Sequence, residues 1–427
     1  MNSFAVKILR GTLRDLARLT IWRYRPGVIG VTGTVGKTST KLAIQAILEH
    51  ARRVRGSTGN LNNDLGLPLA ILGDWSAKDL ALVSRGTPPG TARMQKFFFW
   101  LKVIVGSLWR IIFKTKDYPE ILVLEFGADR PGDIKYLLKI ARPNVSVITA
   151  VGDIPVHVEF YAGPDDVARE KGRLIEYLPS AGFAILNYDD DAVMNLEQRT
   201  RAHLMTFGFE KGAEVKISRM ENRMEGDRPV GISFKLEYKG SFVPVRLNGV
   251  FGRSYAYASA AAASVGIVFG MNLATISDAL ANYTPAESRM QLLPGIRGTF
   301  IIDDSYNASP LSMRAALDTL RDLPAKRKIA VLGDMLEIGK YTIEAHEAVG
   351  KLAARSANVL VTIGPRAKFI AETARVTGMK KTSVISFETA DEARKPVQAL
   401  MKSGDLVLIK ASHSMELAKI VEEVRAF

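Results

Sequence analysis

The glycine-rich run at residues 30–39 constrains the fold more than any other part of this sequence. It reads Gly-Val-Thr-Gly-Thr-Val-Gly-Lys-Thr-Ser. The β-branched residues 28–32 predict a strand that enters the run, and the apolar pattern of residues 41–49 predicts a helix that leaves it. Glycines in such a loop let backbone N–H groups approach phosphate oxygens at a helix N-terminus. The run therefore predicts a binding site for the phosphates of a nucleotide.

Two side chains of this loop have the chemistry that ATP needs. Lys37 is expected to neutralise the β- and γ-phosphates, and the Thr38 hydroxyl is expected to ligate Mg²⁺. The strict pattern G-x-x-x-x-G-K-[ST] is not met, because its first glycine would fall on Val31. The flanking strand and helix nevertheless favour a phosphate loop over a chance glycine turn. The predicted ATP-binding residues of the loop are Gly33, Thr34, Gly36, Lys37, Thr38 and Ser39.

Strand and helix patterns alternate along the chain, which predicts an α/β protein. Apolar runs at 121–125 and 145–150 suit buried parallel strands, whereas 213–250 alternates like an antiparallel patch. After Pro285 a second alternating set predicts a Rossmann-like domain, with strands near 299–303, 328–332, 359–363 and 405–410. We expect a basic N-terminal helix over 1–27, a central P-loop-type ATP-binding domain with a mostly parallel sheet over 28–286, and a C-terminal Rossmann-like domain over 287–427.

The net charge of the chain limits the classes of ligand and partner that we expect for it. Its 427 residues carry a formal charge of +14 and no cysteine. A basic surface attracts polyanions, and no nucleic-acid-binding motif is present, so we expect small phosphorylated ligands or an anionic membrane surface. The lack of cysteine excludes disulfides and thiolate metal sites and suits the cytoplasm. Lys7, Arg10, Arg14 and Arg18 interrupt any apolar core of a signal peptide.

Residues 97–113 form an apolar stretch within an expected helical insertion at about 93–115. Lys102, Gly106, Arg110 and Lys114 recur at i, i+4, so a helix here has one narrow basic stripe and a wide apolar face. The stretch is too short and too charged for a membrane span. Two interpretations remain: a helix packed on its own domain, or a helix lying at the interface of an anionic membrane.

Polar side chains follow several of the predicted strands. Glu125 ends an apolar strand, where a carboxylate can hold Mg²⁺ at the ligand-binding edge of a parallel sheet or simply face solvent. His157 follows another strand and is as plausible a structural residue as a ligand. Lys171, on a predicted helix over 165–178, is unremarkable by sequence physics alone. The turn that contains Asn60, Asn62 and Asn63 suits an amide or carboxylate ligand, or is an ordinary capped loop.

Four motifs together resemble the Mur ligases of cell-wall synthesis. They are the Gly-Thr-Val-Gly-Lys-Thr loop, the segment 59–68 (Gly-Asn-Leu-Asn-Asn-Asp-Leu-Gly-Leu-Pro), the segment 304–310 (Asp-Ser-Tyr-Asn-Ala-Ser-Pro) with Ser312 and Met313, and the segment 332–339 (Leu-Gly-Asp-Met-Leu-Glu-Ile-Gly). The resemblance extends from about Gly30 to Val424. It implies an ATP-dependent ligase that phosphorylates a carboxylate and then lets an amine displace phosphate. The branch it indicates joins D-alanyl-D-alanine to a muramoyl tripeptide.

The resemblance also assigns roles to individual residues. Lys37, His157 and Lys171 are implied to be catalytic, with Thr38 and Glu125 on one Mg²⁺ and His157 on a second. Lys171 matches the lysine that is carbamylated in the family to assist metal binding. Arg289, Asp304 and Tyr257 are expected at the ATP. Asn60, Asn62, Asn63, Asn307 and Lys410 are expected at the substrates.

Three departures from the family pattern leave alternatives open. The family's N-terminal domain grips a UDP group, but about 28 residues precede the loop here. Tyr257 stands where an Asn is expected near the adenine, and Ala411 and His413 replace Gly and Arg near the C-terminus. The rivals are a Mur-type ligase for another carboxylate and a non-catalytic ATP-binding protein docked on a membrane. In the leading interpretation we expect a cytoplasmic monomer that acts on small molecules, with peripheral membrane contact as the open addition.

Overall fold

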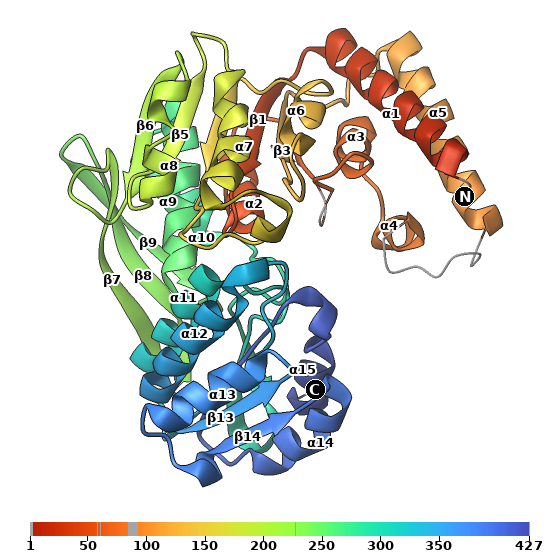
Figure 1. Cartoon of the computed structure of the whole chain (residues 1–427). Helices are drawn as coiled ribbons and strands as arrows, with labels where there is room; N and C mark the ends of the chain where they lie inside the picture. Colours follow the sequence, from red (N-terminus) through yellow and green to blue (C-terminus); the bar gives the residue numbers. More distant parts are fainter. Residues whose placement is uncertain (1–2, 58, 60, 84–92, 227, 427) are drawn as a thin grey trace.

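The computed structural model describes residues 3–57, 59, 61–83, 93–226 and 228–426. Two sheets, each covered by helices, form an upper and a lower body in Figure 1, and a helical layer flanks the upper one. The α/β class and the mostly parallel sheets are therefore confirmed. The change from the first sheet to the second falls between Asn248 and Gln291. The domain boundary expected near 286 lies in that interval and stays a prediction.

The first sheet has the strand order β2-β3-β1-β4-β5-β6-β7-β8-β9. Pairing is parallel from β2 to β7 and antiparallel from β7 to β9, as the alternating pattern over 213–250 predicts. The strands are β1 (Gly27–Thr32), β2 (Val54–Gly56), β3 (Ile121–Glu125), β4 (Val145–Ile148), β5 (Phe183–Asn187), β6 (His203–Gly208), β7 (Val215–Glu225), β8 (Arg228–Tyr238) and β9 (Ser241–Asn248). The interior strand β1 lies between β3 and β4, so the glycine loop leaves the parallel part of the sheet at the carboxyl ends of its strands, where ligands bind.

Helices on both faces of this sheet bury its apolar strands. They are α2 (Lys37–Glu49), α6 (Asp133–Leu138), α7 (Pro164–Glu176), α8 (Asp191–Met194), α9 (Arg253–Val268) and α10 (Leu273–Ala281). The alanines of α9 are almost all buried and let it pack closely against α2. Leu174 of α7 packs from the other face against Gly30 of β1. The phosphate loop and α2 are thus held in place by close packing on both faces of the sheet.

The second sheet has the order β10-β11-β15-β12-β13-β14 and is parallel except for β10. Its strands are β10 (Gln291–Gly295), β11 (Thr299–Asp303), β12 (Arg327–Gly333), β13 (Val359–Ile363), β14 (Val384–Phe387) and β15 (Asp405–Lys410). The covering helices are α11 (Pro310–Asp322), α12 (Thr342–Ser356), α13 (Ala367–Val376), α14 (Ala390–Leu400) and α15 (Ala418–Val424). The carboxyl ends of β11, β12 and β15 supply the loops that approach the first sheet.

We use the name helical layer for α1 (Ser3–Tyr24), α3 (Gly66–Leu72), α4 (Ala77–Val83) and α5 (Arg93–Phe113). Leu13 of α1, Ile71 of α3 and Val103 of α5 are buried in one cluster with residues of β1 and β3. The Tyr24 hydroxyl donates to the carbonyl of Arg110 at 2.7 Å and fixes α1 to α5. The N-terminal helix therefore shares a core with the rest of the layer. Within the described residues, no helix is long and apolar enough to cross a membrane.

Candidate active site

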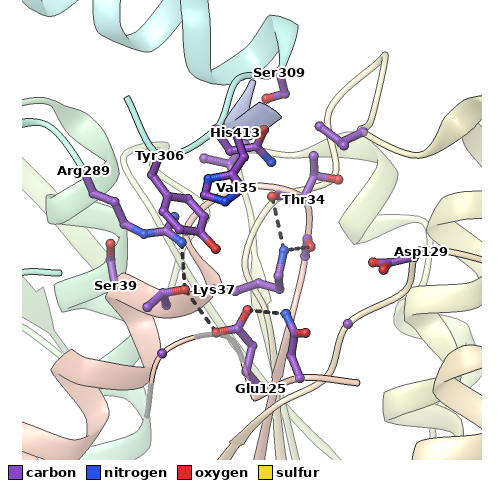
Figure 2. A pocket seen from close by; sticks show the side chains of 18 of the residues that line it. Thr34, Val35, Lys37, Ser39, Glu125, Asp129, Arg289, Tyr306, Ser309 and His413 are labelled. Atoms are coloured by element: carbon purple, nitrogen blue, oxygen red, sulfur yellow. Dashed lines mark hydrogen bonds between the residues drawn. The ribbon is translucent and has the colours of Figure 1, made fainter. Parts of the chain in front are cut away.

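A cavity of about 850 Å³ lies where the glycine loop, the helical layer and the second sheet meet. It brings together most of the predicted site residues (Figure 2). Those that line it are Gly33, Thr34, Gly36, Lys37, Thr38, Ser39, Asn62, Asn63, Glu125, His157, Lys171, Arg289, Asp304, Asn307 and Lys410. Tyr257 is not among the lining residues, and Asn60 lies outside the described residues.

The glycine loop is shaped by two glycines with left-handed or related backbone. Gly36 has φ 90° at the start of α2, and Gly33 has φ 148°. A Cβ on Gly33 would lie 2.0 Å from Thr149 Oγ1, so no other residue fits there without a shift. The Thr149 hydroxyl donates to the Val35 carbonyl at 2.6 Å and holds the loop against the end of β4. This shape leaves the N–H groups at the start of α2 free for an anion.

Lys37 folds back over this loop. Its Nζ donates to the carbonyls of Gly33 at 2.9 Å and Thr34 at 3.3 Å. Burial lowers the pKa of Lys37, and the nearby Glu125 carboxylate opposes that shift. The amine is therefore held by weak carbonyl partners in a desolvated site, where a phosphate would be a much stronger partner.

Glu125 is a buried carboxylate with a partner on each oxygen. The Thr38 hydroxyl donates to Oε2 and the Asn62 amide donates to Oε1, both at 3.1 Å. Burial alone would raise the pKa of Glu125, but the cations Lys41 and Lys37 and the Asn62 amide leave it below its ordinary value. The group is thus ionised at neutral pH despite being 2% exposed.

The pair of Thr38 and Glu125 fits the first Mg²⁺ site that the family implies. A hydroxyl and an ionised carboxylate already in contact are the oxygen donors that Mg²⁺ prefers. Among the described residues no group of three or more His, Cys, Asp or Glu side chains is arranged to hold a metal. A Mg²⁺ at this pair would take its remaining oxygens from water and phosphate, as is usual for nucleotide-bound Mg²⁺.

The sequence analysis missed Lys41, which does not line the cavity but lies beside Glu125 in the buried base of the site. The side chain is 1% exposed, and its Nζ lies 3.7 Å from Glu125 Oε2. The same Nζ donates to the carbonyls of Ser57 at 2.5 Å and Gly59 at 3.1 Å. Its position four residues after Lys37 was the available signal, because i and i+4 share a helix face.

Lys171 and His157 line another part of the cavity. Lys171 is 2% exposed on α7, and burial, with help from Lys37, lowers its pKa to about 7. His157 has φ 71°, with Nε2 3.4 Å from Asp129 Oδ1 and Nδ1 2.7 Å from Glu337 Oε2. Glu337 follows β12, so His157 lies between the two sheets. Glu337 belongs to the segment 332–339 that the sequence analysis quoted, whereas Asp129 was not predicted.

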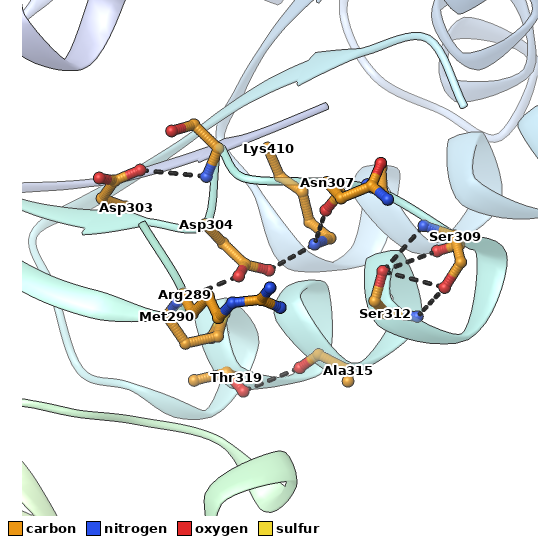
Figure 3. Close-up of polar contacts among 12 residues, drawn as sticks. Arg289, Met290, Asp303, Asp304, Asn307, Ser309, Ser312, Ala315, Thr319 and Lys410 are labelled. Carbon is orange, nitrogen blue, oxygen red and sulfur yellow. Dashed lines mark hydrogen bonds and ion pairs between the residues drawn. The ribbon is translucent and has the colours of Figure 1, made fainter. Parts of the chain in front are cut away.

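The edge of the second sheet contributes a buried ion pair (Figure 3). Lys410 Nζ lies 2.5 Å from Asp304 Oδ2 and donates to the Asn307 carbonyl at 2.8 Å. Burial raises the pKa of Asp304, while Lys410 and the N–H of Met290 oppose the shift. The Lys410 amine is therefore engaged inside the protein, where it shapes the loop that carries Asn307.

Arg289 connects this edge to the phosphate loop. Its Nη2 donates to the Thr38 hydroxyl at 3.1 Å, and its guanidinium carbon lies 4.1 Å from the centre of the Tyr306 ring. The loop that carries Tyr306 ends at Ser309, which caps α11. The Ser309 hydroxyl accepts the backbone N–H of Ser312, and the Ser312 hydroxyl accepts the backbone N–H of Ser309. A cation from the second sheet therefore reaches the same hydroxyl as Glu125.

Two predicted residues have mainly structural partners. Asn63 Oδ1 accepts the N–H groups of Leu65 and Gly66 at the start of α3, and its role at a substrate stays a prediction. The Tyr257 hydroxyl donates to Asp189 Oδ2 at 2.7 Å, and its ring meets Phe209 edge-on. Tyr257 thus supports Phe209, which lines a smaller neighbouring cavity of about 370 Å³.

The helical layer forms the wall of the cavity opposite the second sheet. Arg10, Leu80, Val83 and Trp100 line it, and none of them was predicted. Arg10 Nε lies 2.8 Å from Asp64 Oδ2, which joins α1 to the asparagine turn. These residues come from helices whose mutual packing is not visible in local sequence patterns.

Family models match both bodies of the chain. The Mur ligase middle domain matches residues 31–79 and 108–265, and the Mur ligase glutamate ligase domain matches residues 288–413. This chain belongs to the Mur ligase family. Members of this family are ATP-dependent ligases, so the predicted enzyme class is confirmed. The gap in the first match, 80–107, covers most of α5.

Relatives named as ligases extend the likeness over nearly the whole chain. The UDP-N-acetylmuramoyl-tripeptide–D-alanyl-D-alanine ligase of Bacillus subtilis is 28% identical over 96% of this chain and 79% of its own length. The ligase of the same name from Mycobacterium leprae is 29% identical over 92% of this chain and 72% of its own. The MurF ligase of Thermotoga maritima, solved with ADP, is 27% identical with a TM-score of 0.77 and covers 97% of this chain and 83% of its own.

Proposed function

We propose that this Mur ligase joins D-alanyl-D-alanine to UDP-N-acetylmuramoyl-tripeptide, with ATP converted to ADP and phosphate. The substrates are those in the names of the relatives from B. subtilis and M. leprae. The observation that carries the proposal is the meeting of Glu125 and Arg289, from two sheets, at the Thr38 hydroxyl in a large cavity that Lys37 also lines. The reaction passes through an acyl phosphate: the tripeptide carboxylate takes the γ-phosphoryl group, and the amine then displaces phosphate.

The phosphate end of the cavity supplies cations and donors before the reaction begins. Lys37 moves from the carbonyls of Gly33 and Thr34 to the β- and γ-phosphates, and the N–H groups at the start of α2 bind the same oxygens. Arg289 adds a guanidinium from the other side. When bound at Thr38 and Glu125, Mg²⁺ supplies further charge neutralisation of the phosphates. Donors that are already in place stabilise developing charge without reorganisation.

Lys171 is proposed to be carbamylated. Only a neutral amine attacks CO₂; the new N–C bond forms and the nitrogen loses a proton to give a carbamate anion. The lowered pKa of about 7 makes much of Lys171 neutral at physiological pH. A carbamate would also replace a buried cation near Lys37 with an anion, so that repulsion between two lysines becomes attraction between Lys37 and the carbamate. Its oxygens, with a nitrogen of His157, make a plausible donor set for the second Mg²⁺.

The cavity walls suggest where each substrate lies. Asn62, Arg10 and Trp100 lie on the side of the helical layer, which suits the acid, and Asn307 and His413 lie at the second sheet, which suits the dipeptide. Contacts that cross between the sheets, such as His157 with Glu337, close the cavity from two sides. Closure excludes water, which otherwise hydrolyses an acyl phosphate.

An ADP-release assay with the purified chain tests this function. Rapid release that requires both UDP-N-acetylmuramoyl-tripeptide and D-alanyl-D-alanine, with the amide product identified by mass, is expected. Turnover only with another acid would replace the substrate and keep the ligase. Tight ATP binding without turnover on any acid and amine pair would leave the non-catalytic rival.

A further inference from the structure

The outer side of α5 exposes a row of large apolar side chains. Phe97, Leu101, Val105, Leu108 and Ile112 are between 43% and 65% exposed. Their spacing of three or four residues puts them on one face of the helix, and Trp109, 60% exposed, adjoins it. We call these six residues the apolar face. Soluble proteins seldom expose apolar residues in such a continuous row unless something binds there.

The opposite side of the same helix explains why α5 keeps this orientation. Phe99, Val103 and Ser107 recur every four residues and are at most 3% exposed. Arg23 of α1 donates to the Ile111 carbonyl at 3.0 Å, and Tyr24 donates to that of Arg110. The inner side is thus anchored in the helical layer, and the helix cannot turn its apolar face inward without losing that packing.

The positive charge of the chain is concentrated in α5, in the neighbouring helix α1 and at their ends. Residues 3–25 and 93–116 contain twelve Lys and Arg and a single acidic residue, Asp15. These two segments therefore supply +11 of the formal charge of +14, and the remainder of the chain is close to neutral. The overall basicity of the protein is a local property of α1, α5 and their ends.

From the apolar face and this charge we infer that α5 docks in the plane of an anionic membrane surface. An amphipathic helix rich in Trp, Phe and Leu on one side and flanked by Lys and Arg is the form that inserts at the level of lipid headgroups. Two copies of this chain would bring two strongly positive surfaces together, which opposes a dimer through the same face.

The geometry of α5 suits an interfacial position. Its 21 residues span about 32 Å, so a helix that lies flat can place its whole apolar face along the membrane surface. Trp109, near one end, is a residue type that concentrates at headgroup level. On α1, Trp22 is 69% exposed and precedes the two residues that bond to α5. Lys114 and Lys116 follow the helix and can reach lipid phosphates.

Docking would set the cavity close to the bilayer. Trp100 lies on a different side of α5 from the apolar face and lines the cavity. A helix with its side chains is about 10–12 Å thick, so roughly that distance separates the cavity wall from the headgroups. This inference does not depend on the proposed substrates, since it concerns the outer surface alone.

Vesicle flotation with the full chain tests the inference. One set of vesicles contains phosphatidylcholine with phosphatidylglycerol, and the other contains phosphatidylcholine alone. We expect wild-type protein to float with the anionic vesicles at low salt and to be released as salt rises, because screening weakens surface charge. No flotation with anionic vesicles at low salt, or equal flotation with both sets, would overturn the inference.

Matched variants distinguish binding through the apolar face from nonspecific adsorption of the protein to vesicles. Val105→Glu with Trp109→Glu should weaken binding at least about tenfold, since each buries less apolar area in lipid. Ile343→Glu with Val376→Glu changes two exposed apolar residues of the second body, 52% and 89% exposed, and should leave binding unchanged. Lys114→Glu with Lys116→Glu should weaken binding by about fivefold or more per residue.

Light scattering on the same proteins tests the competing occupant. A wild-type dimer that becomes a monomer in the Val105→Glu, Trp109→Glu variant, with no vesicle binding by either, would assign the apolar face to a second copy. Equal thermal unfolding midpoints across the variants are expected, and they show that lost binding does not come from lost folding.

Discussion

At the phosphate end of the cavity, charged side chains are buried and bound to one another; on the outer side of α5, apolar side chains are exposed and charges surround them. Glu125, Lys41 and Lys171 are each at most 2% exposed, whereas Phe97 and Ile112 of α5 are 63% and 65% exposed. Both arrangements are unfavourable for an isolated folded chain. The proposed ligands account for each arrangement: phosphates and metal in one case, and lipid in the other.

The largest effect is expected from Lys37→Ala, at the phosphate end. The loss of a preorganised cation beside the transferred phosphoryl group should lower ADP release by about 10³-fold. Lys135→Ala, which removes an exposed lysine of α6, is the matched control and should retain normal turnover. Near-normal ADP release from Lys37→Ala would disprove the phosphate assignment.

Lys171→Ala should lower ADP release by about 100-fold, the upper range for a group that supports a metal site. Added short carboxylic acids should restore part of the rate, because they can fill the space of the lost carbamate. Wild-type rates in this variant would remove Lys171 from the site.

The same residue gives a pH dependence. Its pKa of about 7 means that the neutral, CO₂-reactive amine increases as pH rises through 7. At fixed dissolved CO₂, the stimulation of CO₂-depleted enzyme should therefore be stronger at pH 8 than at pH 6. A mass increase on the peptide containing Lys171 that equals CO₂ plus the trapping group, after chemical trapping of the carbamate, is the direct measurement. Equal stimulation at both pH values would contradict the burial argument.

Lys41→Met tests whether the buried charges depend on one another. It leaves Glu125 with one cation fewer in a desolvated site, so unfolding free energy should fall by about 3 kcal/mol. Adding Glu125→Gln should recover part of that loss, because the unpaired charge is then gone. Urea unfolding of both variants and of exposed Lys135→Met measures this, and a simple sum of the two single effects would show no coupling.

The smallest effect is expected on the other side of the comparison. Trp109→Glu changes an exposed residue and should shift unfolding free energy by less than about 0.5 kcal/mol. ADP release on soluble substrates should stay at the wild-type rate, since Trp109 does not line the cavity. A large loss of stability would mean that Trp109 packs inside the protein, which contradicts its exposure.

Local patterns in the sequence were sufficient for most of the fold. Long apolar runs such as 121–125 and 405–410 became strands with those bounds. The strands β2, β5, β6, β10 and β14 were not predicted individually, because each is only three to six residues long and includes exposed or half-buried positions that interrupt the apolar run. For 97–113 one side of α5 is packed in the helical layer, as the first interpretation predicts, and the exposure of the other side leaves the membrane interpretation a proposal.

The site was predictable where the chain itself brings residues together. Lys37 and Thr38 adjoin in the sequence, but Glu337 meets His157 only because the two sheets pack. For Lys171 a signal existed: Val167, Ala168, Leu174 and Ile175 of α7 are buried at helical spacing, and Lys171 falls on their stripe. A charged residue on an apolar helical stripe marks a buried charge, and a buried charge often marks a functional site.

Lys41 has a consequence for the order in which ligands bind. Its amine ties α2 to the carbonyls of Ser57 and Gly59, and the asparagine turn continues from there to Asn62. A nucleotide that shifts the first turn of α2 therefore also shifts the asparagine turn, which faces the proposed site of the carboxylate substrate. We expect the two substrates to show synergy, each lowering the dissociation constant of the other by the same factor, as thermodynamic reciprocity requires.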